Sequence, residues 1–153
     1  MIGPNEKILE LTPEERAHAK NVLMNQAYKM ATTCKNCSLN LTRNQVVFGD
    51  GDINTKLVFI GEAPGGDEDE QGVPFVGRAG QLLTKILEQV NIKRSEIYIT
   101  NIVKCRPQNN RDPEPEEMLA CYHFLQTQIL LIDPAIIILL GILPLNGFLK
   151  QTK

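Results

Sequence analysis

Four cysteines carry the strongest chemical signal in this sequence, at Cys34, Cys37, Cys105 and Cys121. Cys34 and Cys37 form a Cys-x-x-Cys pair, a spacing that commonly holds zinc or an iron–sulfur cluster. Cys121 falls in an expected helix just after the loop with Cys105, so these two thiols can reach one another. One cysteine alone is often simply buried. Four with this spacing favour one shared metal centre, and the spacing fits zinc and a four-iron cluster equally well.

Redox use of the Cys-x-x-Cys pair is a weaker alternative, because a thioredoxin-like motif normally opens a helix after a strand.

The cellular compartment decides whether the thiols stay reduced. The N-terminal residues have no apolar signal core, and no stretch has enough apolar residues to cross a bilayer. We therefore expect a cytoplasmic protein without a membrane partner, whose thiols stay reduced and available to a metal.

A second signal is the glycine-rich segment 61–80, which follows an apolar run. Residues 72–79 have the glycine spacing of a phosphate-binding P-loop but lack its Lys-Ser/Thr pair. The glycines are also wrongly spaced for a dinucleotide-binding turn. Residues 50–54 resemble a calcium loop, but Thr55 stands where that loop requires glycine. These comparisons leave a tight loop that presents backbone N–H groups to a ligand.

Three side chains lie in or near that loop, Glu62, Glu68 and Phe75. Phe75 follows Pro74 and is flanked by glycines, which favours a loop position where the ring can stack on a ligand over a position in the core. Asn101 ends the next expected strand. Its side chain is either a turn former or a paired donor and acceptor for an amide-like edge such as that of a pyrimidine.

Apolar periodicity predicts an α/β fold with a parallel sheet covered by helices on both faces. Ligands bind at the carboxyl ends of such strands, so the Gly61 loop and Asn101 should meet in space. The 153 residues form a single domain without internal repeats. Thr12, Pro13 and Glu15 give the first helix a capping box. The predicted helices are at 12–31, 82–90 and between Pro113 and Asp133; the predicted strands are at 46–48, 57–60, 97–103 and 135–141, with a turn at 49–52.

The formal net charge of −2 argues mildly against a nucleic-acid binder. A local basic stripe can nevertheless bind a phosphate backbone on an acidic protein. Lys104, Arg106 and Arg111 lie close together in the sequence and are candidates for such a stripe; a solvated loop is the alternative.

The motifs together resemble the family 4 uracil-DNA glycosylases, the iron–sulfur members of their superfamily. The resemblance rests on residues 61–65, Glu68-Asp69, residues 72–80 and residues 100–107, along with the four cysteines, and it covers nearly the whole chain from Cys34 to Gly141. It implies a three-layer α/β/α sandwich around a parallel four-stranded sheet. It implies a structural [4Fe–4S] cluster on the four cysteines. The implied activity is hydrolysis of the N-glycosidic bond of uracil in DNA, which leaves an abasic site.

The resemblance also implies roles for single residues. Phe75 would stack on a flipped uracil, and Asn101 would bond its N3–H and O4 edge. Glu68 would lie near uracil C5, where bulk excludes the methyl group of thymine. Backbone N–H groups would contact the base and a phosphate, and Glu62 and Asn110 would position the attacking water. The N–H groups belong to the segment of Gly61, Ala63 and Gly65; Ala63 stands where other superfamily members carry an aspartate.

One family motif has no counterpart in this sequence. The family has a C-terminal His-Pro-Ser turn after a further strand, whereas this chain has no histidine after His123. We therefore expect a single domain, residues 1–153, that lacks the last strand and its catalytic loop, with impaired excision. A non-catalytic iron–sulfur or zinc DNA- or nucleotide-binding module is the alternative. Expected partners are uracil-containing DNA and, as candidates, a sliding clamp or other repair proteins, with the chain a monomer.

Overall fold

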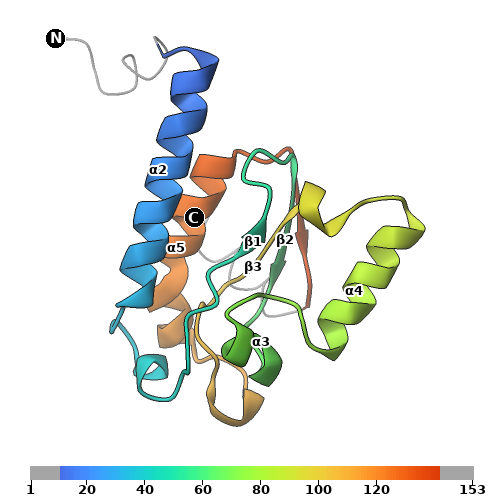
Figure 1. Cartoon of the computed structure of the whole chain (residues 1–153). Coiled ribbons are helices and arrows are strands. Elements are labelled where there is room, and N and C mark those ends of the chain that lie inside the picture. The colour runs from blue at the N-terminus through green and yellow to red at the C-terminus, as the bar shows by residue number, and fades with distance from the viewer. Residues whose placement is uncertain (1–10, 142–153) are drawn as a thin grey trace, which may run out of the picture.

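The computed structural model describes residues 11–141, in which helices and strands alternate along the chain (Figure 1). The alternation predicted from apolar periodicity is confirmed. The elements in chain order are α2 (Pro13–Thr32), η1 (Ser38–Leu41), β1 (Asp50–Gly51), β2 (Leu57–Gly61), α3 (Gly66–Gln71), α4 (Arg78–Gln89), η2 (Arg94–Glu96), β3 (Tyr98–Asn101), η3 (Gln108–Asn110), α5 (Pro115–Ile132) and β4 (Ile136–Leu139).

The sheet has the strand order β1-β3-β2-β4, with β2 at the centre between β3 and β4. Both of these pairings are parallel, as the sequence predicted for the three apolar runs. The parallel register of β2 and β3 pairs Gly61 with Asn101. The carboxyl ends of the two strands therefore lie side by side, which sets the place of the site.

The edge of the sheet beyond β3 differs from the prediction. A strand was expected at 46–48 and a turn at 49–52, but the antiparallel bridge to β3 is formed by Asp50 and Gly51. Gly51 has φ 117°, a conformation open to glycine. Residues 46–48 are buried, and Val47 donates its N–H to the carbonyl of Lys104 at 2.8 Å. Their apolar character thus reflects packing against the loop after β3, not membership of the sheet.

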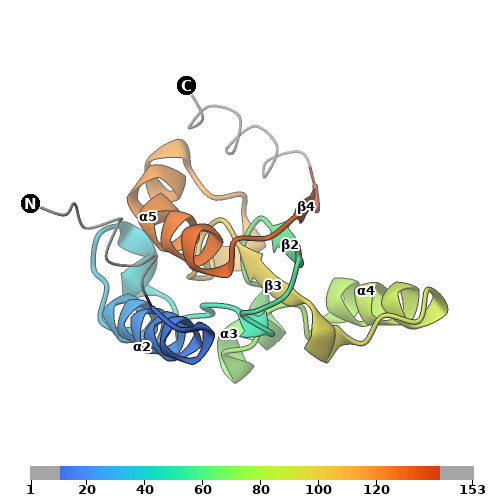
Figure 2. The ribbon, with the colours of Figure 1, turned by 90° about the horizontal axis from the view of Figure 1, so that it is seen from above.

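The helices form layers on the two faces of the sheet (Figure 2). Alternate strand residues face opposite sides. Val58 and Ile60 of β2 pack into the cluster that includes α2 and α5. Phe59 and Ile99 pack on the other side with Leu83 of α4. The predicted three-layer α/β/α sandwich is thereby confirmed, but the four-stranded sheet is not wholly parallel, because β1 is antiparallel to β3.

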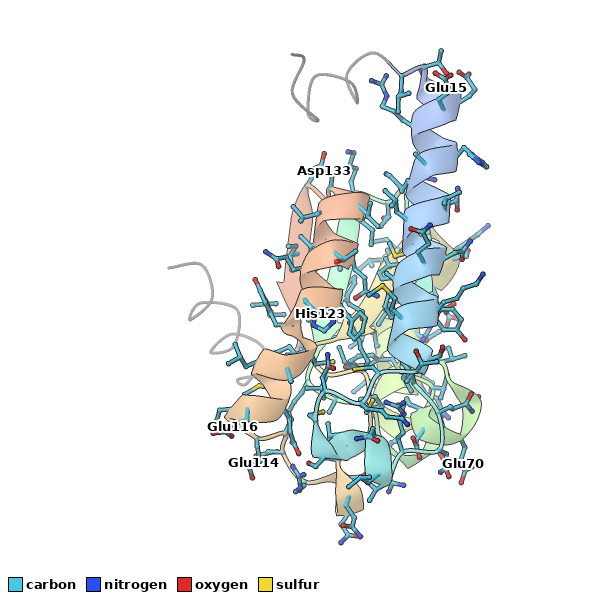
Figure 3. All side chains as sticks on the ribbon, turned by 90° about the vertical axis from the view of Figure 1, so that its left-hand side faces the viewer. Glu15, Glu70, Glu114, Glu116, His123 and Asp133 are labelled. Carbon is cyan, nitrogen blue, oxygen red and sulfur yellow. The ribbon has the colours of Figure 1, made fainter. Side chains whose placement is uncertain are left out.

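Helices α2 and α5 pack side by side and run in opposite directions, since Glu15 near the start of α2 and Asp133 at the end of α5 lie toward the same end of the pair (Figure 3). The predicted capping box is present. Thr12 N–H donates to Glu15 Oε2 at 2.7 Å, and Glu15 N–H donates to Thr12 Oγ1 at 3.2 Å. These bonds occupy two backbone donors that a helix start otherwise leaves unpaired. None of the described helices is long and apolar enough to span a membrane.

Two further expectations about elements need correction. The loop predicted between Gly61 and Gly80 contains the short helix α3, whose polar sequence has no apolar period that would reveal it. The strand predicted at 135–141 forms as β4, but it is not buried on both faces. Ile136 is 58% exposed and Ile138 38% exposed, because among the described elements β4 pairs only with β2. The expectation that this chain lacks the last strand and catalytic loop of the family concerns residues outside the described part of the chain.

The interior of α5 provides a test of this packing. Leu125 is 2% exposed in the core, whereas Leu119 on the same helix is 65% exposed. We expect Leu125→Ala to lower the free energy of unfolding by about 2–5 kcal/mol, because the truncation removes apolar contacts and leaves a cavity. Leu119→Ala is the matched control and should change it by about 0.5 kcal/mol or less. Urea unfolding measures both, and equal losses in the two variants would contradict the packing described here.

Candidate functional site

The carboxyl ends of β2 and β3 open into a cleft of about 400 Å³. Its walls come from the loop after β2, helix α3, the loop before α4, the end of β3 and the loop that contains η3. The cleft collects side chains predicted from widely separated segments of the sequence. The predicted residues that line it are Glu62, Ala63, Gly65, Glu68, Phe75, Asn101 and Asn110.

Gly61 is not a lining residue, but it sets the distance between two that are. A Cβ atom built on Gly61 would lie 2.5 Å from Phe75 Cζ and 2.4 Å from Asn101 Oδ1. The aromatic ring and the carboxamide therefore both lie over the bare backbone of Gly61. The predicted convergence of the Gly61 loop and Asn101 is confirmed, and glycine is needed at this position because any side chain would push the two apart.

Asn101 holds an unusual polar atom. Asn101 is 2% exposed, and its side-chain Oδ1 is buried without a hydrogen-bond partner among the described residues. A buried acceptor left unpaired costs free energy, and most such groups in proteins find a partner. Because Asn101 lines the cleft, a ligand that brings an N–H donor to Oδ1 would satisfy it.

The loop that carries Phe75 is held in a constrained conformation. Phe75 has φ 53°, in the left-handed region that larger residues rarely adopt. A Cβ on Gly80 would lie 1.9 Å from the Phe75 carbonyl oxygen, so the start of α4 approaches the loop closely. On the other side, Glu68 accepts the N–H of Gly77 at 3.2 Å. Glu68 thus braces α3 against the loop at the rim of the cleft.

Glu62 and Asn110, which are predicted to position water, are far apart in the sequence, but both line the cleft. Glu62 follows β2, and the pKa of its carboxyl is raised, first by burial and then by the neighbouring carboxylate of Asp112. Asn110 lies in η3 and accepts a hydrogen bond on Oδ1 from Arg106 Nε at 2.8 Å. The cleft therefore contains a carboxyl group suited to accept a proton nearer neutral pH than an ordinary glutamate.

The prediction of a basic stripe is wrong for Lys104, one of its three residues. Lys104 is 1% exposed, and its ammonium group points into the interior. It donates to Thr100 Oγ1 at 2.6 Å, to the carbonyl of Asn101 at 2.7 Å and to Gln128 Oε1 at 2.6 Å. Burial lowers the pKa of Lys104 to about 7. Lys104 therefore ties the end of β3 to α5 and cannot contact a phosphate, whereas Arg111 lines the cleft.

The four cysteines meet as predicted, since all four thiols line one small cavity at the end of α2 and along α5. They are free of disulfides. Burial raises the pKa of the thiol of Cys105, and that of Cys121 to about 11. Arg43 Nη1 donates to Cys105 Sγ at 3.1 Å, and the N–H of Lys104 donates to Cys121 Sγ at 3.3 Å. Among residues 11–141, no group of acidic, histidine or cysteine side chains is arranged to hold a single metal ion.

Several contacts that build the site could not be found from the sequence. Asp69 is buried and accepts the N–H and the side-chain amide of Asn44 at 3.0 and 2.7 Å, which fixes α3 to the chain before β1. Arg43 and Asp112 act through partners distant in sequence, so no local pattern distinguishes them from surface residues. The sequence predicts Lys104 in a basic stripe with Arg106 and Arg111, and its burial could not be found because acceptors such as Gln128 are distant in sequence.

Comparisons with known proteins agree with this geometry. Residues 48–152 match the family described as the uracil DNA glycosylase superfamily. The chain is 47% identical over 136 residues to a type-4 uracil-DNA glycosylase of Thermotoga maritima, a match that covers 89% of this chain and 71% of that protein. It is 49% identical over 109 residues to a type-4 uracil-DNA glycosylase of Archaeoglobus fulgidus, covering 71% and 55%. For that of Pyrobaculum aerophilum the identity is 41% over 127 residues, covering 83% and 65%. The chain thus spans from 55% to 71% of the length of these curated relatives.

The loop with Arg111 generates a pH-dependent prediction. Arg111 donates to Glu117 Oε1 at 2.7 Å and to Oε2 at 2.9 Å, which lowers the pKa of Glu117 from 4.5 to about 2, with further bonds from Glu114 N–H and Ser38. Because the folded-state pKa is depressed, the stabilisation is complete above pH 4.5 and is lost as the pH falls toward 2.

We expect Glu117→Gln to lower the free energy of unfolding by about 1–2 kcal/mol at pH 7, a modest value because Arg111 is partly exposed. The difference from the unsubstituted chain should shrink as the pH falls from 5 toward 3. Urea unfolding across this range measures it. Glu116→Gln, at the exposed start of α5 (Figure 3), is the control; a loss in Glu117→Gln that is independent of pH would contradict the assignment.

Proposed function

This chain belongs to the uracil-DNA glycosylase superfamily, and on that premise we propose that its cleft binds a uracil base turned out of DNA and hydrolyses the bond between the base and its sugar. The observation that supports this most directly is the buried Oδ1 of Asn101, which has no hydrogen-bond partner within residues 11–141 and lies beside the ring of Phe75. Uracil offers an N–H donor to that oxygen and a flat face to that ring. Its O4 accepts from the amide nitrogen of Asn101.

The same pairing gives specificity. Cytosine presents an acceptor at N3 and a donor at its exocyclic amine, which is the opposite polarity. Binding cytosine would leave buried polar groups unpaired on both partners, a larger penalty than a lost methyl contact. Glu68 at the rim is the group proposed to face uracil C5 and to exclude the methyl group of thymine. Turning the base out of the stack costs a few kcal/mol, which stacking and edge contacts offset.

The proposed chemistry is dissociative. The departing uracil becomes an anion and the sugar becomes cationic, so stabilising those charges contributes more than strong activation of water. Backbone N–H groups of Gly61, Ala63 and Gly65 are proposed to contact the base and a phosphate. Glu62 and Asn110 are proposed to position the water, and the raised pKa of Glu62 favours its taking the water's proton near neutrality.

Three arginines surround the cleft and support contact with DNA. Arg78 and Arg111 line it, and the guanidinium carbon of Arg106 would lie 3.4 Å from a Cβ built on Gly66. Cations at the rim of a base pocket suit the flanking phosphates, which would make the affinity for DNA fall with salt. The arginines thereby replace the expected stripe that included Lys104.

For the thiol cavity we propose a [4Fe–4S] cluster held by Cys34, Cys37, Cys105 and Cys121. A tetrahedral zinc site with Zn–S bonds of about 2.3 Å draws its sulfurs to within about 3.8 Å of one another. A four-iron cluster instead binds each thiolate at a separate iron, so its ligands stand farther apart. The four thiols line one cavity, which supports a single centre shared by all of them. When bound, the cluster would cross-link the end of α2, the loop after β3 and α5, without taking part in hydrolysis.

The free thiols fit a reducing compartment, so we propose a cytoplasmic repair protein. We further propose that it acts as a monomer on uracil-containing DNA, since one chain supplies all the residues assigned above. Contact with a sliding clamp or other repair proteins stays a prediction from the resemblance.

The 153-residue chain, with its metal, tests the function on a single-stranded oligonucleotide that contains one uracil, against the same strand with thymine. We expect an affinity preference for uracil of about 10-fold or more, and alkali-labile abasic product that forms only from the uracil strand. Equal affinity for both strands together with no abasic product would refute the proposal.

Asn101→Ala should abolish most of the preference for the uracil strand over a matched strand with cytosine, because it removes both edge bonds. A well-paired edge contributes about 1–3 kcal/mol of discrimination, which is about 5- to 150-fold in affinity. Asn21→Ala, an exposed residue of α2, is the control and should keep the preference. A uracil preference that survives Asn101→Ala would mean that another group reads the base.

Metal analysis tests the cofactor. Chain purified without oxygen should contain iron and acid-labile sulfide in equal amounts and absorb visible light. Cys121→Ala should lose iron and lower the melting temperature, because one ligand is gone and the cavity on α5 is no longer cross-linked. Thr127→Ser, at a half-buried position of α5 outside the lining of the thiol cavity, should retain both. Colourless protein with one zinc per chain would replace the cluster by zinc.

A further inference from the structure

Arg94 lies behind the cleft, outside its lining, yet it holds the loop that presents Phe75. The residue opens η2, just before β3. Its Nη1 donates to the carbonyl of Phe75 at 2.5 Å, and its Nη2 donates to the carbonyl of Pro74. Nη1 also lies 3.4 Å from Thr84 Oγ1 on α4. One guanidinium therefore links the loop to the helix that follows it.

The backbone at Phe75 needs such support. Its φ of 53° lies in a region that costs about 1–2 kcal/mol for a residue with a side chain, and conformations of this kind persist only where the surroundings hold them. Two successive carbonyls directed at one planar fork fix both peptide groups around Phe75, because the guanidinium donates along parallel directions. Without that fork, the loop is free to relax and carry the ring away from Gly61.

The close approach of Gly80 also restricts the Phe75 carbonyl. The start of α4 approaches the Phe75 carbonyl so closely that a Cβ on Gly80 would overlap it. The carbonyl is therefore enclosed by α4 on one side and by Arg94 on the other. Thr84 donates back to the carbonyl of Gly80 at 3.0 Å, which continues the same network into α4.

We infer that Arg94 is a positioning residue for base recognition: it holds Phe75 in its left-handed conformation, so that the ring stays over Gly61 beside Asn101. The inference rests on the proposed stacking role of Phe75 and adds the group that keeps the stack in place. Arg94 does not touch the base. Its effect on binding passes entirely through Phe75, which distinguishes it from a residue that only stabilises the fold.

The first test observes the ring without any ligand. In nuclear magnetic resonance spectra, contacts between the Phe75 ring protons and the α protons of Gly61 should be present in the unsubstituted chain. Arg94→Met should lose them, because it keeps the aliphatic stem and removes the fork. Arg16→Met, the same change at an exposed site on α2, should keep them. Persistence of the ring contact in Arg94→Met overturns the inference whether or not the chain binds uracil.

The second test is a double-mutant cycle on the preference for a uracil strand over a thymine strand. Base–aromatic stacking contributes about 1–3 kcal/mol, so Phe75→Ala should weaken uracil binding about 10-fold, and Arg94→Met should approach the same loss. The double variant should lose no more than Phe75→Ala alone. Additive losses, or a lower melting temperature with the uracil preference intact, would assign Arg94 a purely structural role and refute the inference.

Arg94→Lys covers the case in which Arg94→Met fails to fold. A lysine keeps the charge and can reach one carbonyl but not both, so the ring contact should weaken and the uracil preference should fall by an intermediate factor. Full retention of both in Arg94→Lys counts against the inference. Failure of the proposed function appears differently, as an unsubstituted chain with no uracil preference while the ring contact still depends on Arg94.

Discussion

The parallel pairing of β2 with β3 is the constraint on which the site depends. It brings the last residue of one strand, Gly61, opposite the last residue of the other, Asn101. The absence of a side chain on Gly61 then lets the ring of Phe75 and the carboxamide of Asn101 approach one another. A shift of one residue in this register would turn Asn101 to the other face of the sheet, so that it would no longer face Phe75 in the cleft.

Buried polar side chains behind the cleft hydrogen-bond to one another and to the backbone. Lys104 joins the backbone of Asn101 to Gln128 on α5, and Gln128 in turn donates to the carbonyl of Phe48 at 2.8 Å. The residue after Lys104 is Cys105, so the short segment from Asn101 to Cys105 contributes to both the cleft and the thiol cavity. Buried polar networks of this kind stabilise a unique arrangement only when every member is paired. The Oδ1 of Asn101 has no partner in the part of the chain that the structure describes, so it stands out against this background and is the atom to which we propose that a ligand donates.

The sequence predicted most of the architecture because the informative segments are strongly patterned. The apolar runs that became β2, β3 and β4 and the periodic residues of α4 and α5 need no tertiary information. The four thiols and the residues lining the cleft were also found, by motif and by resemblance. What escaped prediction was decided by distant partners. The exposure of Ile138 depends on what lies beside β4, and the inward turn of Lys104 depends on acceptors from α5. The clamp of Arg94 on Phe75 links residues separated by a helix, and no local pattern reveals it.

A crystal structure of the chain with uracil tests the central claim most directly. The account predicts the base in the cleft, stacked on Phe75, with N3–H donating to Asn101 Oδ1 and O4 accepting from its amide nitrogen. Uracil bound elsewhere, or bound in the cleft while Oδ1 of Asn101 still lacks a partner, would contradict it.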